Sequence, residues 1–227
     1  MRSVVLTGVS RGLGAALYTE LAGRGDRLFA IGRHFTDVQR TAVDGDRIVL
    51  FEADLAEPAT LPDAGVLADF LRGECVLIHN AGTVEPIGPV GALPRPAVLA
   101  AVAINLTSPM LLTDAFLAAR PRDAATRILY VSSGATRRVI DHWAVYSATK
   151  RGAEMFVDAV AAQEPDAYVA NVNPGVMDTE MQAVVRESEF PERDRYAGLH
   201  GRGELPDPAE VAHRIIAEHI DRPITSQ

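Results

Sequence analysis

The chain has 227 residues, 48% apolar and 23% charged, which excludes a mainly disordered chain and suits a single α/β domain. Its net charge is −8, so general electrostatic attraction to nucleic acid or to an anionic membrane is not expected. The single cysteine, Cys75, excludes an intramolecular disulfide and a cysteine-rich zinc site. Apolar runs fall short of the roughly 18 residues that cross a bilayer, and the first apolar stretch is too short for a signal peptide. We therefore expect a cytoplasmic protein.

Short apolar runs alternate with helix-like segments along the chain. Strands are expected over residues 3–7, 27–31, 48–51, 75–79, 127–132 and 168–172, and helices near 12–23, 36–43, 59–72, 96–119, 144–163 and 208–220. The strand runs are apolar nearly throughout, as in a parallel sheet that is buried on both faces. The alternation predicts an α/β fold, a doubly wound parallel sheet with helices on both faces, in which ligands bind at the carboxyl ends of the strands.

Two stretches interrupt this alternation. Residues 84–96 contain four prolines and two glycines, so we expect a loop after the fourth strand. Residues 188–207 are rich in glycine, proline and charge, and they are long for a connection within a compact domain. We expect them to be irregular and to belong to a substrate lid around 176–207. Neither stretch has the character of a linker, and we expect a single domain over 1–227.

A glycine-rich turn follows the first expected strand. Gly8, Gly12 and Gly14 form the pattern Gly-x-x-x-Gly-x-Gly between this strand and the next helix. Glycines lack a Cβ atom and let the backbone approach a pyrophosphate, and the helix N-terminus offers free N–H groups. The alternative is an ordinary strand-to-helix turn. The position directly after the first strand favours a dinucleotide site.

The end of the second expected strand bears on which dinucleotide binds. Sites for an unphosphorylated dinucleotide usually carry an acidic residue there, whereas this chain has Gly32 followed by Arg33. A guanidinium can hold a 2′-phosphate through paired hydrogen bonds, and Arg11 in the glycine turn could approach the same group. Because the chain has 21 arginines, both could instead be solvated surface residues. The pattern favours NADPH over NADH.

Tyr146 and Lys150 lie four residues apart at the start of an expected helix, on one face. Lys150 is the sole lysine of the chain, although it could still be an ordinary exposed residue. A neighbouring ammonium should lower the pKa of the phenol from its usual value of about 10 and fit it for proton transfer. Ser133 follows the fifth expected strand, where its hydroxyl can donate to a substrate carbonyl, but Ser132 competes and either serine could simply form a turn. Asn105, inside an expected helix, suggests a backbone or water contact.

Together these residues resemble the short-chain dehydrogenase/reductase family over nearly the whole chain. The matching motifs occur in the family's order and spacing: Thr7-Gly8-x-x-x-Gly12-x-Gly14, Asp54-Leu55, Asn80-Ala81-Gly82, Asn105, Ser133, Tyr146, Lys150, and Asn173-Pro174-Gly175 with Thr179. The resemblance implies a Rossmann-type fold and an oxidoreductase whose cofactor is NADP(H). It also implies a homodimer or homotetramer.

The resemblance implies a role for each residue of the catalytic group. Tyr146 is expected to act as the general acid/base, and Lys150 to lower its pKa and hold the nicotinamide ribose. Ser133 is expected to orient and polarise the carbonyl. Asn105 is expected to help hold a water that links Lys150 to bulk solvent.

The same resemblance implies a cofactor site. The expected residues are Gly8, Ser10, Arg11, Gly12, Leu13, Gly14, Arg33, Asp54, Leu55, Asn80, Ala81, Gly82, Tyr146, Lys150, Pro174, Gly175, Val176 and Thr179. Within this set, Asp54 is expected near the adenine, Asn80 near the adenine ribose and Thr179 near the nicotinamide carboxamide.

Some stretches are most similar to the sepiapterin reductase and benzil reductase group, notably residues 80–86, 105–110, 132–135 and 174–182. Trp143 fits the dicarbonyl reductases of that group. The resemblance therefore implies a small-molecule carbonyl substrate, a ketone or an α-dicarbonyl. Candidate lining residues are Trp143, Met177, Met181, Phe190 and Tyr196.

Two alternatives stay open, namely an NAD-linked alcohol dehydrogenase of the same fold and a non-enzymatic NADPH-binding sensor. The six histidines show no metal-ligand spacing, and we expect no metal, nucleic acid or membrane partner. Relatives usually add a further strand at the C-terminus, and residues 222–227 could begin one.

Overall fold

The structure is a computed structural model that describes residues 1–224. Its strands form one parallel sheet in the order β3-β2-β1-β4-β5-β6. They are β1 (Arg2–Thr7), β2 (Arg27–Gly32), β3 (Ile48–Glu52), β4 (Glu74–His79), β5 (Thr126–Val131) and β6 (Tyr168–Val172). The chain winds outward from β1 in one direction and from β4 in the other, so the switch point lies between these two strands. The expected doubly wound sheet is confirmed.

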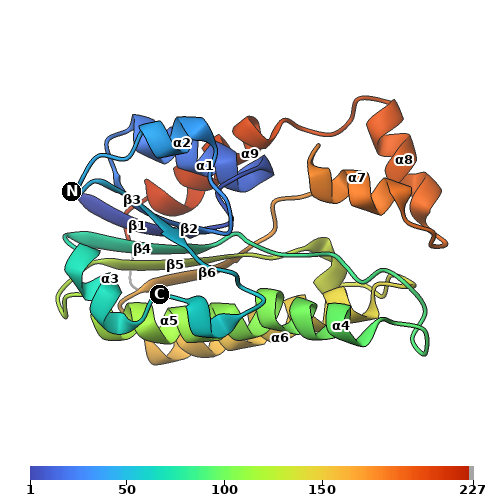
Figure 1. Ribbon diagram of the computed structural model, residues 1–227, viewed down its shortest axis with the longest axis horizontal. Coiled ribbons are helices and arrows are strands. Elements are labelled where there is room, and N and C mark those ends of the chain that lie inside the picture. Colours follow the sequence, from blue (N-terminus) through green and yellow to red (C-terminus); the bar gives the residue numbers. More distant parts are fainter. Residues whose placement is uncertain (225–227) are drawn as a thin grey trace.

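Helices cover both faces of the sheet (Figure 1). On one face lie α1 (Gly12–Gly23), α2 (Asp37–Thr41) and α9 (Pro208–Ile215), and on the other lie α3 (Ala64–Phe70), α5 (Ser108–Ala119) and α6 (Ala144–Gln163). Alternate residues of one strand supply the two cores, because successive side chains point to opposite faces. Val4 and Leu6 pack on the α1 side, whereas Val5 packs on the α5 side.

Two expected helices are shorter than their sequence pattern indicated. The segment expected as a helix over 59–72 contains a 3₁₀ turn at Pro58–Thr60 and then α3, because the Asp63 carboxylate accepts a hydrogen bond from the Val66 N–H at 2.9 Å and starts the helix there. The helix expected near 36–43 is reduced to α2, which the Thr36 side chain caps.

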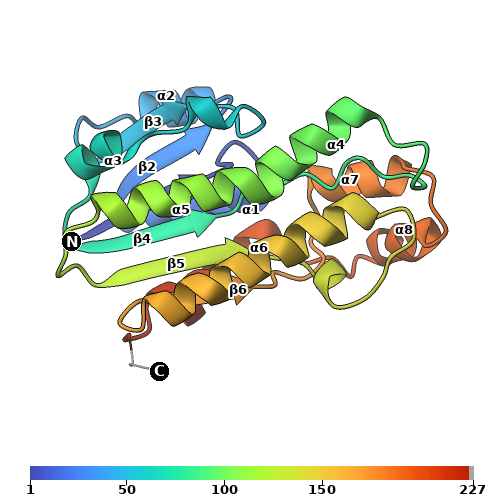
Figure 2. The same ribbon diagram turned by 90° about the horizontal axis from the view of Figure 1, so that it is seen from below.

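One long helix runs from Arg95 to Ala119 over 25 residues. It consists of α4 (Arg95–Val102), a π-helical turn (Ala103–Thr107) and α5. By length and composition this helix could cross a membrane, which the search for apolar runs missed because polar residues such as Asn105 interrupt the run. Figure 2 shows it lying beside α6 across one face of the sheet, as a layer of the domain.

The segment expected to be irregular over 188–207 is partly helical. Helices α7 (Glu180–Glu187) and α8 (Arg193–Gly201) lie beyond the carboxyl ends of the strands, near the start of α6 (Figures 1 and 2). Such short helices depend on packing more than on their own sequence, and α7 and α8 bury Val185 and Tyr196 against a cluster that includes Trp143. The sequence pattern alone could not reveal that partner.

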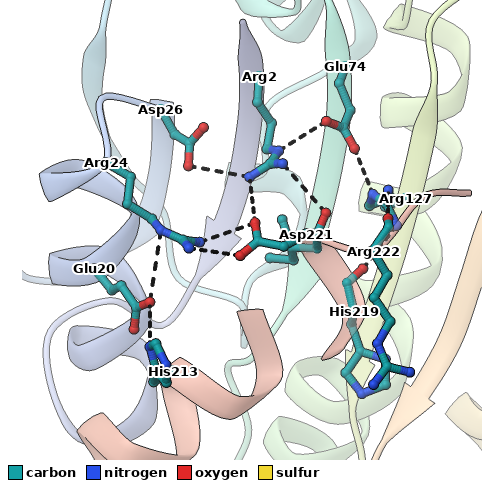
Figure 3. Close-up of polar contacts among 11 residues, drawn as sticks. Arg2, Glu20, Arg24, Asp26, Glu74, Arg127, His213, His219, Asp221 and Arg222 are labelled. Carbon is teal, nitrogen blue, oxygen red and sulfur yellow. Dashed lines mark hydrogen bonds and ion pairs between the residues drawn. The ribbon is translucent and has the colours of Figure 1, made fainter. Parts of the chain in front are cut away.

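A network of ion pairs closes the opposite edge of the sheet, at the amino ends of the strands (Figure 3). Glu74 accepts from Arg127 at 2.6 Å and from Arg2 at 3.1 Å, and Arg24 pairs with Asp221 at 2.7 Å. These contacts hold the residues after α9 against the sheet. Residues 221–224 form no strand, and the rest of the possible strand expected over 222–227 lies outside the described residues.

Candidate active site

The glycine turn after β1 is held tightly against the end of β4. Gly8 and Gly12 have φ angles of +74° and +53°, which favour glycine. A Cβ on Gly14 would lie 1.9 Å from the Gly8 carbonyl oxygen, so a larger residue does not fit there. The Asn80 amide donates to the carbonyls of Thr7 and Gly8 at 3.0 and 3.1 Å. This backbone cradle at the N-terminus of α1 fits the pyrophosphate of a dinucleotide.

Two further loops meet this turn. Thr179, which precedes α7, lies so close that a Cβ on Gly12 would be 3.2 Å from its methyl carbon. Gly82 lies beside the catalytic group, because a Cβ there would be 3.2 Å from both the Lys150 Nζ and the Asn105 Oδ1. The loops after β1, β4 and β6 thus form one edge, as the sequence predicts for ligand-binding loops of a doubly wound sheet.

Arg33 and Arg11 have different surroundings. The Arg33 side chain is 58% exposed at the end of β2, and its Nη1 is 4.0 Å from the Asp54 carboxylate. Arg11 instead pairs with Glu180 at the start of α7. The structure therefore brings Arg33 and Asp54 together and directs Arg11 toward α7.

The structure brings Ser133 and Tyr146 together. Ser133 follows β5 and caps a 3₁₀ turn (Gly134–Thr136), while Tyr146 lies in the first turn of α6. Burial raises the pKa of the Tyr146 phenol above its ordinary value, and a hydrogen bond with Ser133 partly opposes this rise. The expected lowering of this pKa by Lys150 is wrong, because desolvation raises the pKa and the group that lowers it is Ser133. A raised pKa keeps the phenol protonated, as a general acid requires.

Lys150 is enclosed in the interior, with 3% of its surface exposed. Its ammonium donates to the Val131 carbonyl at 2.9 Å and lies 4.7 Å from the centre of the Tyr130 ring, where a cation–π contact adds to the hydrogen bond. Burial lowers the pKa of Lys150 to about 8, and the nearby Glu154 carboxylate opposes this shift. The alternative of an exposed helix lysine is wrong.

Asn105 lies in the π-helical turn and is fully buried. Its side chain accepts from the Thr83 N–H at 2.9 Å and donates to the Thr83 carbonyl at 2.8 Å and the Thr149 hydroxyl at 3.1 Å. Its own carbonyl accepts from the Tyr130 hydroxyl at 3.0 Å. Asn105 therefore ties the loop after β4 to α6, and the backbone contact suggested by the sequence is present.

Aromatic side chains from the start of α6, from α8 and from the loop before α8 form one cluster with Tyr146. Trp143 packs edge-on to Tyr146 with ring centres 5.5 Å apart and stacks on Tyr196 at 5.4 Å. Phe190 completes the cluster, and Met181 packs against its edge. Met177 differs, because it lies in the core between the sheet and α1 and α9, as a packing residue.

Sequence reasoning missed three buried polar residues around this site. Tyr130 and His79 come from β5 and β4, and the His79 ring contacts the Thr113 hydroxyl at 2.8 Å. Burial lowers the pKa of His79 to about 3, so this ring is neutral. The third residue, Glu154, stands four positions after Lys150 on α6, a helical spacing that could have revealed it.

Comparisons with known proteins agree with this arrangement. A family profile described as short chain dehydrogenase matches residues 2–189. The chain is 32% identical to a benzil reductase ((S)-benzoin forming) from Bacillus cereus, covering 95% of this chain and 92% of that protein. It is 31% identical to a sepiapterin reductase from Meriones unguiculatus, over 93% of this chain and 88% of that protein. The crystal structure of the KRED1-Pglu enzyme matches with a TM-score of 0.86 at 26% identity, over 99% of this chain and 97% of that one.

Proposed function

This chain belongs to the short-chain dehydrogenase family, and from that membership we propose that it is an NADPH-dependent carbonyl reductase acting on a ketone or α-dicarbonyl. The observation that carries the proposal is the convergence of Ser133, Tyr146 and Lys150 at the sheet edge that also bears the glycine turn. Proteins of this family are oxidoreductases that use a nicotinamide cofactor. The cradle of backbone groups at this edge fits such a cofactor.

The catalytic residues divide the work at the substrate oxygen. NADPH, when bound, supplies the hydride that reaches the carbonyl carbon. Tyr146 donates its phenolic proton to the carbonyl oxygen, and Ser133 donates a hydrogen bond to the same oxygen and polarises it. The Lys150 ammonium, which lies one helical turn after Tyr146 on α6 and is held by the Val131 carbonyl and the Tyr130 ring, stabilises the phenolate that remains.

The position of Arg33 supports NADPH over NADH. Its guanidinium is largely free in solvent at the end of β2, with one carboxylate, Asp54, at 4.0 Å. An exposed guanidinium beside the cofactor edge can turn toward a 2′-phosphate and hold it through paired hydrogen bonds. Gly32 leaves no carboxylate at the place where NAD sites carry one.

The aromatic cluster supports a substrate with an apolar or aromatic body. Trp143 packs on Tyr146, and the segment around α8 supplies the other two rings, Phe190 from the preceding loop and Tyr196 from the helix. Flat rings favour other flat rings, so aryl ketones and diaryl diketones suit this surface. The names of the benzil and sepiapterin reductases that the chain is similar to point to the same substrate class.

The experiment is cofactor consumption with a panel of diketones and aromatic ketones, in wild type and in Tyr146→Phe. We expect wild type to consume NADPH, and Tyr146→Phe to lose turnover while its NADPH dissociation constant stays nearly unchanged. Tyr18→Phe is the matched control, because the buried Tyr18 hydroxyl on α1 has no hydrogen-bond partner among residues 1–224. Retained turnover in Tyr146→Phe would overturn the assignment of the acid. Binding of NADPH without turnover of any panel member would favour a sensor.

A further inference from the structure

A buried carboxylate holds the residues on both sides of Ser133. One Glu154 oxygen accepts from the Ser132 hydroxyl at 2.6 Å and from the Thr136 hydroxyl at 3.0 Å. The single Thr136 hydroxyl hydrogen is shared between this carboxylate and the Ser133 carbonyl, whose oxygen lies 2.9 Å away in the 3₁₀ turn that Ser133 begins. Glu154 is 6% exposed and belongs to α6, the helix that carries Tyr146.

Glu154 therefore connects α6 with the end of β5, two elements whose relative position sets the geometry of the site. Tyr146 and Lys150 move with α6, whereas Ser133 moves with the end of β5. Hydrogen bonds from Ser132 and Thr136 to the one Glu154 carboxylate join these two elements. The second Glu154 oxygen accepts from Arg151 at 3.0 Å, which completes the pairing of this buried charge.

We propose that Glu154 is a positioning residue of the reductase reaction, which sets the Ser133 hydroxyl against the Tyr146 phenol and places a carboxylate one helical turn from Lys150 on α6. The inference rests on the proposed function, since it concerns the same proton transfer. Glu154 contacts neither substrate nor cofactor and acts through Ser132, Thr136 and the field at Lys150.

Because Lys150 is buried, the negative charge of Glu154 has a strong influence on the pKa of its ammonium group. The ammonium is desolvated, and Glu154 is the carboxylate that opposes the resulting fall in its pKa. The other titratable groups around Lys150 and Tyr146 are His79, Tyr130, Tyr196 and Arg151. His79 is neutral, and burial raises the pKa values of Tyr130 and Tyr196, so these two are also uncharged near neutral pH. Arg151 is paired with Glu154 itself at 3.0 Å, and 61% of its side chain is exposed.

Two substitutions separate the hydrogen bonds of Glu154 from its charge. In Glu154→Gln the amide oxygen can still accept from Ser132 and Thr136, but the negative charge is gone. In Glu154→Ala the hydrogen bonds and the negative charge are both lost. Asp158→Asn is the control, because it removes a carboxylate from an exposed position one turn further along α6.

For Glu154→Ala we expect kcat with a diketone to fall about 10- to 100-fold while KM changes less than about threefold, because the aromatic contacts to substrate are intact. For Glu154→Gln we expect kcat within about fivefold of wild type. The alkaline limb of its pH–rate profile should move to lower pH, since loss of a negative charge lowers the pKa values of Lys150 and Tyr146. Asp158→Asn should match wild type in both measurements.

A second readout does not depend on turnover. Tyrosinate absorbance during alkaline titration, taken as the difference between each protein and its Tyr146→Phe counterpart, reports the ionisation of Tyr146. The midpoint should be lower in Glu154→Gln than in wild type. If wild type reduces no member of the panel, the proposed function fails, whereas this midpoint still decides the role of the Glu154 charge.

Unchanged kcat in Glu154→Ala, or an unshifted Tyr146 midpoint in Glu154→Gln, would overturn the proposal. If Glu154→Ala does not fold, as circular dichroism would show, Thr136→Val tests the same link from the other side. It removes one donor to Glu154 and should lower kcat with KM nearly unchanged. Wild-type kcat in Thr136→Val would then count against positioning by Glu154.

Discussion

Replacement of Gly14 by alanine should open the glycine turn, because the structure leaves no room for a single methyl group there. The added Cβ would lie 1.9 Å from the Gly8 carbonyl oxygen and 2.4 Å from the Asn80 amide nitrogen. Moving the Asn80 side chain relieves only the second of these contacts, so the Gly8 peptide must shift as well and the turn must open. The two Asn80 hydrogen bonds to Thr7 and Gly8, at 3.0 and 3.1 Å, are then lost.

The expected loss of stability can be estimated from the two Asn80 hydrogen bonds. Each contributes about 0.5–1.5 kcal/mol to stability, so Gly14→Ala should destabilise the turn by about 1–3 kcal/mol. If the intact turn is what binds the pyrophosphate, the dissociation constant for NADPH should rise about 5- to 150-fold. Gly23→Ala is the matched control at the end of the same helix, where a Cβ meets nothing within 4 Å. It should leave binding unchanged and stabilise the fold by up to about 1 kcal/mol.

The assays are NADPH titration by fluorescence and urea unfolding of both variants. The unfolding measurement does not depend on any assumption about the cofactor. If Gly14→Ala binds NADPH as tightly as wild type and unfolds at the same urea concentration, the close approach of Gly14, Gly8 and Asn80 is not what shapes this turn.

Two further predictions concern cofactor choice and acid stability. The double variant Gly32→Asp/Arg33→Ala should shift the NADPH-to-NADH ratio of kcat/KM by about 10- to 100-fold toward NADH, whereas an unchanged ratio would favour an NAD-linked enzyme. Burial raises the pKa of Glu74, but hydrogen bonds from Arg127 and Arg2 prevail and the net pKa lies below its usual 4.5. Stability from Glu74 is therefore present above about pH 4.5 and is lost as pH falls through the folded-state pKa. Thermal melts of Glu74→Gln should show a smaller drop between pH 7 and pH 3 than wild type, and parallel drops would contradict this reasoning.

Local patterns were enough to predict the sheet and most of the edge that bears the site. Each strand is a short apolar run, and each helix after it repeats with a helical period, so both can be recognised without knowledge of their partners. The glycine turn and the spacing of Tyr146 and Lys150 are likewise properties of one segment. Their meeting at the carboxyl edge follows from the winding of parallel strands.

The features that the sequence did not reveal depend on contacts between distant segments. Helices α7 and α8 are too short and too polar to form alone, and only packing against Trp143 makes them helical. Met177 resembles a substrate-lining residue by position, yet its surroundings place it in the core beside α1 and α9.

The electrostatics of the site were decided by tertiary structure for the same reason. The Tyr146–Lys150 spacing predicts a lowered phenol pKa, but desolvation, which depends on everything packed around Tyr146, reverses the direction. The link from Glu154 to Ser132 and Thr136 spans 22 and 18 residues of chain. The sequence by itself determined which chemistry-bearing residues exist and which strand or helix carries them. Burial and long-range hydrogen bonds, which form only when the elements pack, decided their charge states and their alignment.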